Sequence, residues 1–399
     1  MDHDRRHRVF RGITRNVLLL GFVSLFTDLS SQMVFPLIPL YLFGVLGTGA
    51  SVVGVVEGAA ETTASFVKVL SGYWSDRLRS RKPFVLIGYS LSAISKPFFA
   101  FAGSWPLVLV IRMFERVGKG VRSAPRDAIV AESVAEGVRG KAYGFHRAMD
   151  GIGSVLGALL AFVLLSTTGS DYGRIFLLAG IPGIAAVLFV LLIREPAPAG
   201  EQKAAGVSMR VSLGALPANL RLVILGASLF YLGHFGYAFL LLRAKDVGLG
   251  DQTAILMYVL FYVVYVIAAI PAGSLSDRIG RKPVLVASYL AFGLVSLGLI
   301  LASDLRSLLP LFAVYGVSFA MFDGVQRAYV VDLAPRNLRG TALGTFHAAI
   351  GLVALPGGYI AGALWDKLGP EATFVYGLVL AVASSFLLLR VRAGRRTGA

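Results

Sequence analysis

Basic side chains recur at helical spacing inside a mostly apolar stretch of this 399-residue chain. Within residues 105–131 they are separated by three or four positions and comprise Arg112, Arg116, Lys119, Arg122 and Arg126. At about 100° per residue they cover an arc of about 120° on a helix, which makes one charged face. Glu115 falls within that arc and Asp127 just beside it. Such a face can bind an anion, exchange a proton through a carboxylate, or neutralise acids on neighbouring elements.

Acids and histidines on other apolar stretches form smaller sets with the same spacing. In the first half these are Asp28 with Gln32, Glu57 with Glu61, and His146 with Asp150 and Arg147. The second half is poorer and offers His234, Asp323, Gln326, Arg327 and His347. Asp323 and Arg327, four positions apart, fit a structural ion pair within one helix as well as a ligand site. Charge-handling chemistry is therefore expected mainly in the first half of the chain.

The sequence lacks the residue patterns of enzymes and metal sites. It has no cysteine, which excludes disulfides and thiolate ligands. His146 has no second histidine at zinc-site spacing, and no nucleophile–base set is present. The glycines at 151, 153 and 157 differ in spacing from a dinucleotide fingerprint, and no strand precedes them, so close helix packing is expected there. No enzymatic activity, metal or cofactor is expected.

The elements that carry these residues are predicted to be membrane-spanning helices. The chain is 56% hydrophobic and only 15% charged, whereas soluble domains are about one-quarter charged. A spanning helix needs about 20 apolar residues. The twelve predicted spans are residues 16–46, 51–75, 83–103, 105–131, 140–167, 173–193, 219–243, 252–275, 283–302, 307–332, 340–365 and 371–391. We therefore expect an all-α membrane protein in contact with the lipid bilayer.

Basic residues between the spans fall on alternate connections. The segments rich in Arg or Lys are the N-terminus, 77–82, 139–141, 194–221, 278–282, 336–339 and the C-terminus. Because basic loops stay on the cytoplasmic side, both termini are predicted to be cytoplasmic. The net charge of +16 belongs largely to these loops, so nucleic acid is not expected as a partner.

The longest break between spans begins at Arg194 and is rich in Pro, Ala and Gly, which indicates a flexible linker. It divides the chain into a six-helix bundle at 1–193, a cytoplasmic linker at 194–218 and a second six-helix bundle at 219–399. The two bundles also share sequence, as the next motif shows.

One loop motif occurs in each half, at an interval of about 200 residues. The first copy contains Gly72, Asp76, Arg77, Arg81 and Lys82, and the second contains Gly273, Asp277, Arg278, Arg281 and Lys282. Two halves of like sequence and the same helix order predict a parallel repeat, with a substrate site near mid-membrane at the repeat interface.

The Gly-x-x-x-Asp-Arg loop after the second span, with its second copy after the eighth, resembles the signature of the major facilitator superfamily. The resemblance covers essentially the whole chain. It implies twelve transmembrane helices in two pseudo-symmetric six-helix bundles, and alternating access by rocking of those bundles. It also implies that Asp76 and Arg77 help to lock one conformation. The first copy is one residue longer and lacks a counterpart of Gly280.

Further stretches resemble motifs of the same family. Arg116-Val-Gly-Lys119-Gly120 resembles a fourth-helix motif whose arginine is tied to proton coupling, although Lys119 replaces the usual glutamine. Asp28 stands where many proton-coupled members carry a first-helix acid. Residues 153–158 resemble the fifth-helix antiporter signature without its usual proline, so the export signature is half present.

These observations predict a secondary active transporter that moves a small solute across the cytoplasmic (inner) membrane and acts as a monomer. The proton gradient is its expected energy source. The proton-coupling candidates are Asp28, Arg116, Glu57, Glu61 and Asp150. The substrate-cavity candidates are Gln32, Arg112, Lys119, His146, Arg147, His234, Asp323, Gln326, Arg327 and His347. The basic face favours efflux of an anionic or amphiphilic compound, with proton-coupled uptake of an organic anion as the alternative. A channel and a membrane enzyme are disfavoured.

Overall fold

A computed structural model describes residues 13–78, 80–195, 214, 216–335 and 338–391. The basic N-terminal run, most of the predicted linker and the last eight residues lie outside this part of the chain. The side chain of Asp76 also lies outside it, and that residue is described here only by its helix.

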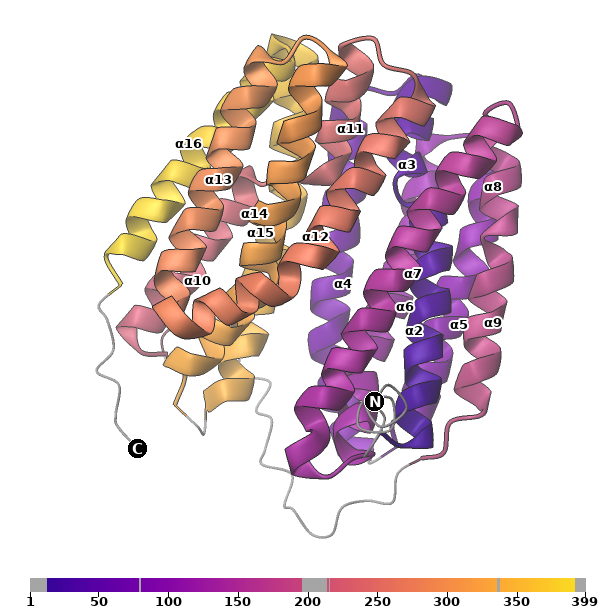
Figure 1. Cartoon of the computed structure of the whole chain (residues 1–399), viewed down its shortest axis with the longest axis vertical. Helices are drawn as coiled ribbons and strands as arrows, with labels where there is room; N and C mark the ends of the chain where they lie inside the picture. Colours follow the sequence, from indigo (N-terminus) through magenta and orange to yellow (C-terminus); the bar gives the residue numbers. More distant parts are fainter. Residues whose placement is uncertain (1–12, 79, 196–213, 215, 336–337, 392–399) are drawn as a thin grey trace, which may run out of the picture. The chain divides into compact units, whose positions relative to one another are not determined.

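The described chain is helical, and the twelve predicted spans are confirmed within a few residues (Figure 1). In the first half they are α2 (Arg15–Val34) with α3 (Leu37–Leu40) and η1 (Tyr41–Val45), α4 (Ala50–Leu78), α5 (Lys82–Phe98) with η2 (Phe99–Phe101), α6 (Trp105–Glu132), α7 (Arg139–Thr167), and α8 (Tyr172–Leu178) with α9 (Gly180–Leu191). In the second half they are α10 (Ala218–Gly233) with α11 (Gly236–Asp246), α12 (Asp251–Ile279), α13 (Arg281–Leu301), α14 (Leu305–Leu333), α15 (Arg339–Leu368) and α16 (Pro370–Leu389). A short turn, η3 (Glu136–Val138), precedes α7.

Several helices are interrupted or joined where the sequence dictates it. Pro36 follows α2 and cannot donate a backbone hydrogen bond, so the regular helix stops at Val34. The seventh span breaks at His234 and Phe235, and α11 begins at Gly236 with φ +68°. Gly280 (φ +99°) forms by itself the turn between α12 and α13, a conformation that favours glycine.

The chain divides into two compact units, which are described separately. Unit 1 contains residues 1–35, 67–102 and 110–206, and unit 2 contains residues 36–66, 103–109 and 207–399. The beginnings of α4 and α6 thus pack with unit 2 and their remainders with unit 1.

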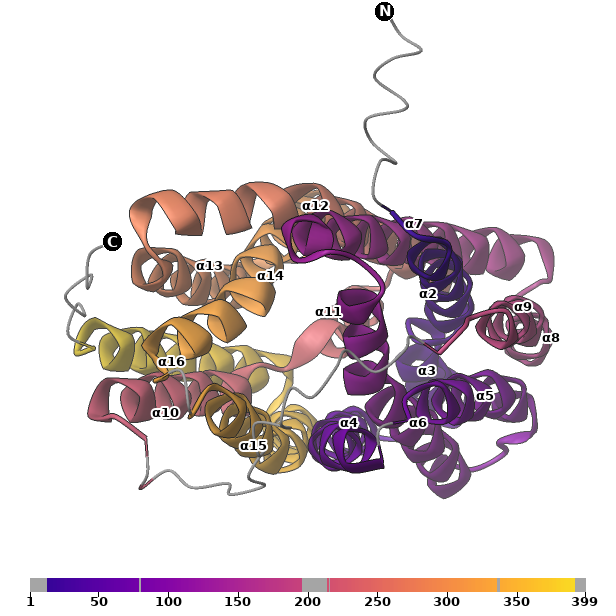
Figure 2. The same ribbon diagram turned by 90° about the horizontal axis from the view of Figure 1, so that it is seen from below.

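Unit 1 is organised around α2, which packs against α7 and α9 (Figures 1 and 2). A Cβ atom at Gly153 would lie 2.2 Å from the carbonyl oxygen of Leu25, and one at Gly157 would lie 2.3 Å from that of Leu29. These two glycines therefore let α7 touch the backbone of α2, which confirms the close packing expected for them.

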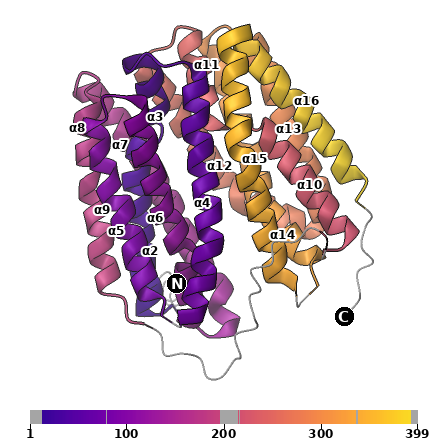
Figure 3. The ribbon, with the colours of Figure 1, turned by 180° about the vertical axis from the view of Figure 1, so that it is seen from behind.

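In unit 2, α13 packs against α14 and α16, and α10 packs against α15 and α16. The first half of α4 lies beside α15 (Figure 3), where Gly54 and Gly358 face each other across the contact. Asp366 at the end of α15 accepts hydrogen bonds from the backbone nitrogens of Ala50 (2.8 Å) and Ser51 (3.0 Å), which caps the start of α4.

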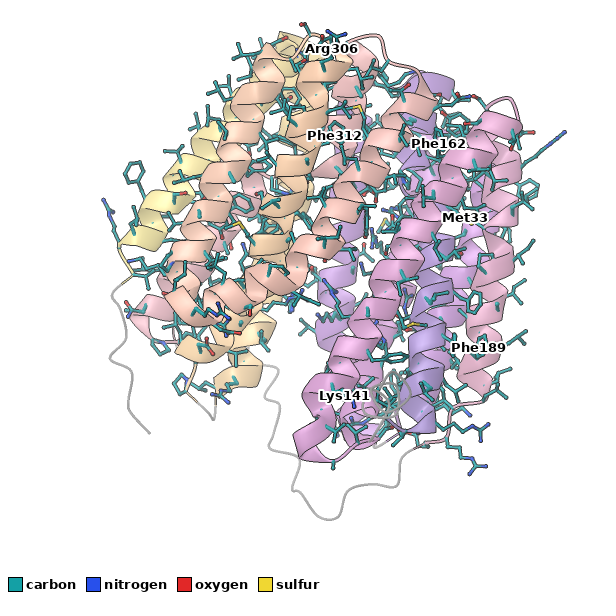
Figure 4. All side chains as sticks on the ribbon, in the orientation of Figure 1. Met33, Lys141, Phe162, Phe189, Arg306 and Phe312 are labelled. Carbon is teal, nitrogen blue, oxygen red and sulfur yellow. The ribbon has the colours of Figure 1, made fainter. Side chains whose placement is uncertain are left out.

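The basic ends of the helices meet at one end within each unit. In unit 1, Arg81 pairs with Glu132 at 2.9 Å, and the Lys82 ammonium donates to the carbonyl of Leu191 at 3.0 Å. Figure 4 shows Lys141 at this end of α7 and Phe162 far along the helix toward the other end. In unit 2, Lys282 likewise donates to the carbonyl of Leu389 at 2.7 Å.

Candidate functional site

The charged face of α6 is buried inside unit 1. The exposed fractions are 0% for Arg112, 1% for Glu115, 7% for Arg116 and 6% for Arg122. Lys119 and Arg126, further along the same face, are exposed and half-buried respectively. Because a charged side chain is costly to bury alone, the residues around each buried group decide its role.

Arg112 and Arg116 share two neighbours, a carboxylate and an aromatic ring. Glu115 Oε2 lies 3.4 Å from Arg112 Nη1 and 3.5 Å from Arg116 Nε. The two guanidinium carbons lie 3.9 Å and 4.9 Å from the centre of the Phe35 ring, at the end of α2. Both guanidinium groups are thus held over a ring face by cation–π attraction and share one carboxylate.

Arg122 and Lys96 fix α6 and α5 to their neighbours through neutral oxygens. Arg122 donates to the hydroxyl of Ser92, and its guanidinium carbon lies 4.6 Å from the centre of the Tyr89 ring. Lys96 is fully buried and donates to Ser30 Oγ at 3.0 Å, with the carbonyl of Thr27 at 3.4 Å. In the part of the chain that the structure describes, no carboxylate lies within ion-pair distance of Lys96.

The acids of α2 and α7 approach each other. Asp28 interacts electrostatically with Asp150 and with three cations of α6, which are Lys119, Arg122 and Arg126. His146 Nδ1 lies 3.5 Å from a carboxylate oxygen of Asp150, one turn along α7. The structure therefore places four predicted site residues, Asp28, Asp150, His146 and Lys119, in one region of unit 1.

Arg126 and Arg147 also act electrostatically on Asp150, so they belong to the same region. Gln32 is buried on α2 beside Gly157, and Arg147 is exposed on α7. Arg126 pairs with its neighbour Asp127 at 2.7 Å. The predicted pairing of Asp28 with Arg116 stays a prediction, while Arg116 contacts Glu115 and the ring of Phe35.

In unit 2 the candidates lie among aromatic rings. His234, at the break between α10 and α11, lies 3.2 Å from the hydroxyl of Tyr315. Rings of Phe230, Tyr231, Phe292, Phe319 and Phe322 surround the same histidine at centroid distances of 5.0–6.3 Å. His347 packs beside the ring of Phe346.

The remaining polar candidates of unit 2 have partners of their own or face outward. Asp323 accepts from Arg327 at 3.0 Å, the predicted pair within one helix, and from Tyr265 at 3.3 Å. Gln326 donates to the hydroxyl of Tyr289 at 2.7 Å. On α4, a Glu57 oxygen lies 3.5 Å from the Tyr237 hydroxyl and Glu61 is exposed.

The two copies of the loop motif make matching contacts. Arg81 pairs with Glu132 in unit 1, and Arg281 pairs with Asp332 at 3.1 Å and with Asp277 at 2.7 Å in unit 2. Lys82 and Lys282 are half-buried and donate to backbone carbonyls, whereas Arg77 and Arg278 are exposed. Gly72 approaches Ala124, and Gly273 has open space beside it.

Three residues of this network were not among the predicted site residues. Lys96 lies near the end of an apolar span, and only its charge in that setting could have drawn attention to it. Ser30 and Tyr89 carry no such signal, because a hydroxyl in an apolar stretch is common and its partners come from other helices.

Comparison with known proteins identifies the family. The model of the Major Facilitator Superfamily matches residues 20–242 and 223–398. An uncharacterized MFS-type transporter of Methanocaldococcus jannaschii is 40% identical over 386 residues, which cover 95% of each chain. The chain is therefore a multi-pass membrane transporter, and it belongs to the major facilitator superfamily.

More distant relatives and solved structures agree with this family. The Fosmidomycin resistance protein of Escherichia coli is 25% identical over 369 residues, covering 89% of this chain and 88% of that protein. The structure of a mutant of the nucleoside transporter NupG superimposes with a TM-score of 0.78 at 16% identity, covering 95% of this chain and 100% of that one. A D-xylose-proton symporter superimposes with a TM-score of 0.74 at 18% identity, covering 94% and 97%. These two structures support the twelve-helix fold.

Proposed function

We propose that this transporter exports a small solute across the cytoplasmic membrane by alternating access and that entry of protons drives the export. Both termini and the segment between the two halves are cytoplasmic in this proposal, because the basic connections alternate with poorly charged ones.

The observation that carries the proposal is the protonatable cluster of Asp28, Asp150 and His146, with Lys119, Arg122 and Arg126 beside it. Two carboxylates that interact disfavour being charged at the same time, so one of them tends to hold a proton. Nearby cations favour the charged form and therefore promote release of that proton. The cluster joins α2, α6 and α7. A change in the packing of these helices would alter the charge around the acids, which links proton uptake to conformation.

The direction of transport is supported by the relatives. Two of them are named for resistance, the Fosmidomycin resistance protein of Escherichia coli and the Multidrug resistance protein MdtH of Aeromonas hydrophila, at 25% identity each. Resistance by a membrane transporter is most simply explained by export, so we assign the same direction to this chain.

The test uses everted membrane vesicles or proteoliposomes that contain the full chain, with a pH gradient imposed acid inside. A panel of radiolabelled organic anions, cations and neutral compounds is offered outside. The proposal expects at least one of them to accumulate, with saturation, and to leak out when a proton ionophore collapses the gradient. Saturable flux that ignores the gradient would overturn proton coupling.

Proton-coupled uptake of an organic anion is the second candidate. It is favoured by the buried arginines of α6, which suit an anion in either direction of transport. The same vesicles decide between the two, because uptake requires accumulation when the vesicle exterior, not the interior, is acid.

A further inference from the structure

The buried charges of unit 1 do not balance around α6. Among the described residues of this unit, the basic side chains at least nine-tenths buried are Lys96, Arg112, Arg116 and Arg122. One carboxylate, Glu115, is buried to the same extent. Glu115 Oε2 lies within ion-pair distance of two guanidinium groups, those of Arg112 and Arg116. We call Arg112 and Arg116 the arginine pair.

Glu115 is a loose partner for the arginine pair. Its Oε2 atom is shared between both arginines at 3.4 and 3.5 Å, whereas charge-assisted hydrogen bonds are about 2.8 Å long. Its Oε1 atom has no hydrogen-bond partner among the described residues, and the same is true of Nε and Nη1 of Arg116. Unsatisfied donors on a buried guanidinium are costly, and guanidinium N–H groups are well suited to bind the oxygens of carboxylates and phosphates.

Phe35 gives the arginine pair a fixed position. Its ring faces both guanidinium groups, at 3.9 and 4.9 Å. The N–H bonds of a guanidinium group lie in its plane, so contact with the face of the ring does not use these donors. Arg116 lies near the middle of α6, which places these donors near mid-membrane depth.

We propose that the arginine pair is the site that binds the anionic group of the transported solute, a carboxylate or a phosphate-like group. The inference rests on the proposed function and names the substrate class. Glu115 acts as an internal anion that holds the two guanidinium groups until the solute's oxyanion takes its place. Arg116 supplies the donors, and Glu115 competes for them.

This competition predicts the direction in which each substitution changes the affinity for the anion. Removing the charge of Glu115 removes the competitor, so Glu115→Gln tightens anion binding. Removing the guanidinium group weakens it, so Arg116→Gln lowers anion affinity at least roughly tenfold. Arg116→Lys keeps the positive charge and loses the planar guanidinium group, so its anion affinity should lie between that of the unchanged protein and that of Arg116→Gln. Purely structural roles for both residues would make both neutral variants bind less well.

The experiment titrates the purified full-length protein with four probes that share one ring: phenylphosphonate, benzoate, benzamide and benzylamine. Stabilisation against thermal unfolding, followed by tryptophan fluorescence, gives the apparent Kd of each. The matched control is Arg174→Gln, because Arg174 is an arginine of the same unit with a 72% exposed side chain that pairs with Asp171 at 2.8 Å.

The expected result is stabilisation by one or both anions over benzamide and benzylamine, with opposite shifts in Glu115→Gln and Arg116→Gln and none in Arg174→Gln. The proposal is overturned if the neutral or cationic probe binds as well as the anions, or if Glu115→Gln weakens binding. If Arg116→Gln fails to fold, the direction of the change in anion affinity in Glu115→Gln still tests the proposal. Anion binding without gradient-driven flux would refute the proposed export and leave the site standing, whereas proton-driven flux of cations alone would refute the site.

Discussion

A carboxylate inside a membrane helix is costly to charge, and nearby cations reduce this cost. Lys119, Arg122 and Arg126 of α6 favour the charged form of Asp28, whereas burial and Asp150 on α7 oppose it. Such a carboxylate can exist in either protonation state, provided that the distance to the cations differs between conformations. Asp28 is therefore the residue at which proton coupling is best tested.

Replacing Asp28 with Asn imitates the protonated acid at nearly equal size. We expect Asp28→Asn to lower gradient-driven accumulation by roughly tenfold or more and to change the affinity for substrate by less than tenfold. Substrate exchange without a gradient should continue. The measurement is accumulation and counterflow in proteoliposomes, with Asp171→Asn, an exposed acid that caps α8, as the control. If Asp28→Asn still accumulates substrate against its gradient with normal pH dependence, Asp28 is not the proton-coupling residue and Asp150 becomes the candidate.

The sequence predicted which helix faces carry charged residues, but it did not predict which of these residues contact each other. The face of α6 follows from spacing alone, because a buried arginine has few tolerable positions. The contacts of Lys96 with Ser30 and Thr27 do not, because periodicity within α5 says nothing about which face of α2 it meets. For the same reason, periodicity could not show that Lys119, Arg122 and Arg126 are the cations that act on Asp28.

At the scale of elements, hydropathy alone would have missed two helices. Ten helices of the described chain are long and apolar enough to cross a membrane, and α4 and α6 are not among them. Charged residues lower the hydropathy of both, among them Glu57, Glu61 and Lys68 on α4. Both were predicted nevertheless, and the alternation of basic connections through twelve segments supports them. The breaks at Pro36 and His234 were not predicted, since a broken membrane helix depends on neighbours that satisfy its free backbone groups.

The contact between α4 and α15 depends on glycine. A Cβ atom at position 358 would lie 2.2 Å from the carbonyl oxygen of Gly54, so the two helices must separate to admit even a methyl group. We expect Gly358→Ala to destabilise the protein by about 1–3 kcal/mol. Gly344→Ala, on the same helix with open space around it, should be neutral or stabilising by about 0.5–1 kcal/mol. Thermal unfolding of both variants in detergent measures the difference, and equal melting temperatures would contradict the packing.

The start of α14 predicts a pH dependence. Asp304 is the exposed N-cap residue, and hydrogen bonds from the Ser307 hydroxyl and backbone nitrogen hold the pKa of its carboxyl below the ordinary value. A depressed pKa means that the cap stabilises the fold above the unfolded-state pKa and loses this effect as pH falls through the folded-state pKa. Asp304→Ala should therefore lower the melting temperature at pH 7 and make less difference near pH 3. An equal difference at both pH values would show that the charge is not involved.

At the scale of the whole molecule, the internal repeat extends from sequence to contacts. Arg81 with Glu132 and Arg281 with Asp332 are equivalent pairs, one in each unit. Each joins the loop motif to the end of a helix that carries the candidate site residues of its unit. Contacts repeated at equivalent places, away from mid-membrane, are suited to stabilising a conformation rather than to binding a solute.

Asp277 provides the test of that role. It pairs with Arg281 at 2.7 Å, is 64% exposed and lies two residues from the end of α12. Asp277→Asn should lower the transport rate severalfold, because the conformation held by Arg281 loses one carboxylate. The affinity for substrate should change by less than tenfold, which corresponds to about 1.4 kcal/mol. Initial rates and Kd in the same preparation separate the two effects, and a larger loss of affinity would place Asp277 in the binding site.

The orientation of all twelve helices can be tested with single cysteines, because the natural chain contains none. Gly103, Gly137 and Gly250 lie in connections where an added Cβ atom meets nothing within 4 Å. Each substitution should therefore leave the packing intact. We expect an impermeant maleimide added to whole cells to label Gly103→Cys and Gly250→Cys and to spare Gly137→Cys, which lies in a basic connection. A permeant maleimide should label all three, and the cysteine-free parent should not react.

Labelling of Gly103→Cys and Gly137→Cys from the same side would mean that α6 does not cross the membrane. The charged face of α6 would then be an interfacial surface, and both the proton cluster and the arginine pair would lose their place at mid-membrane depth.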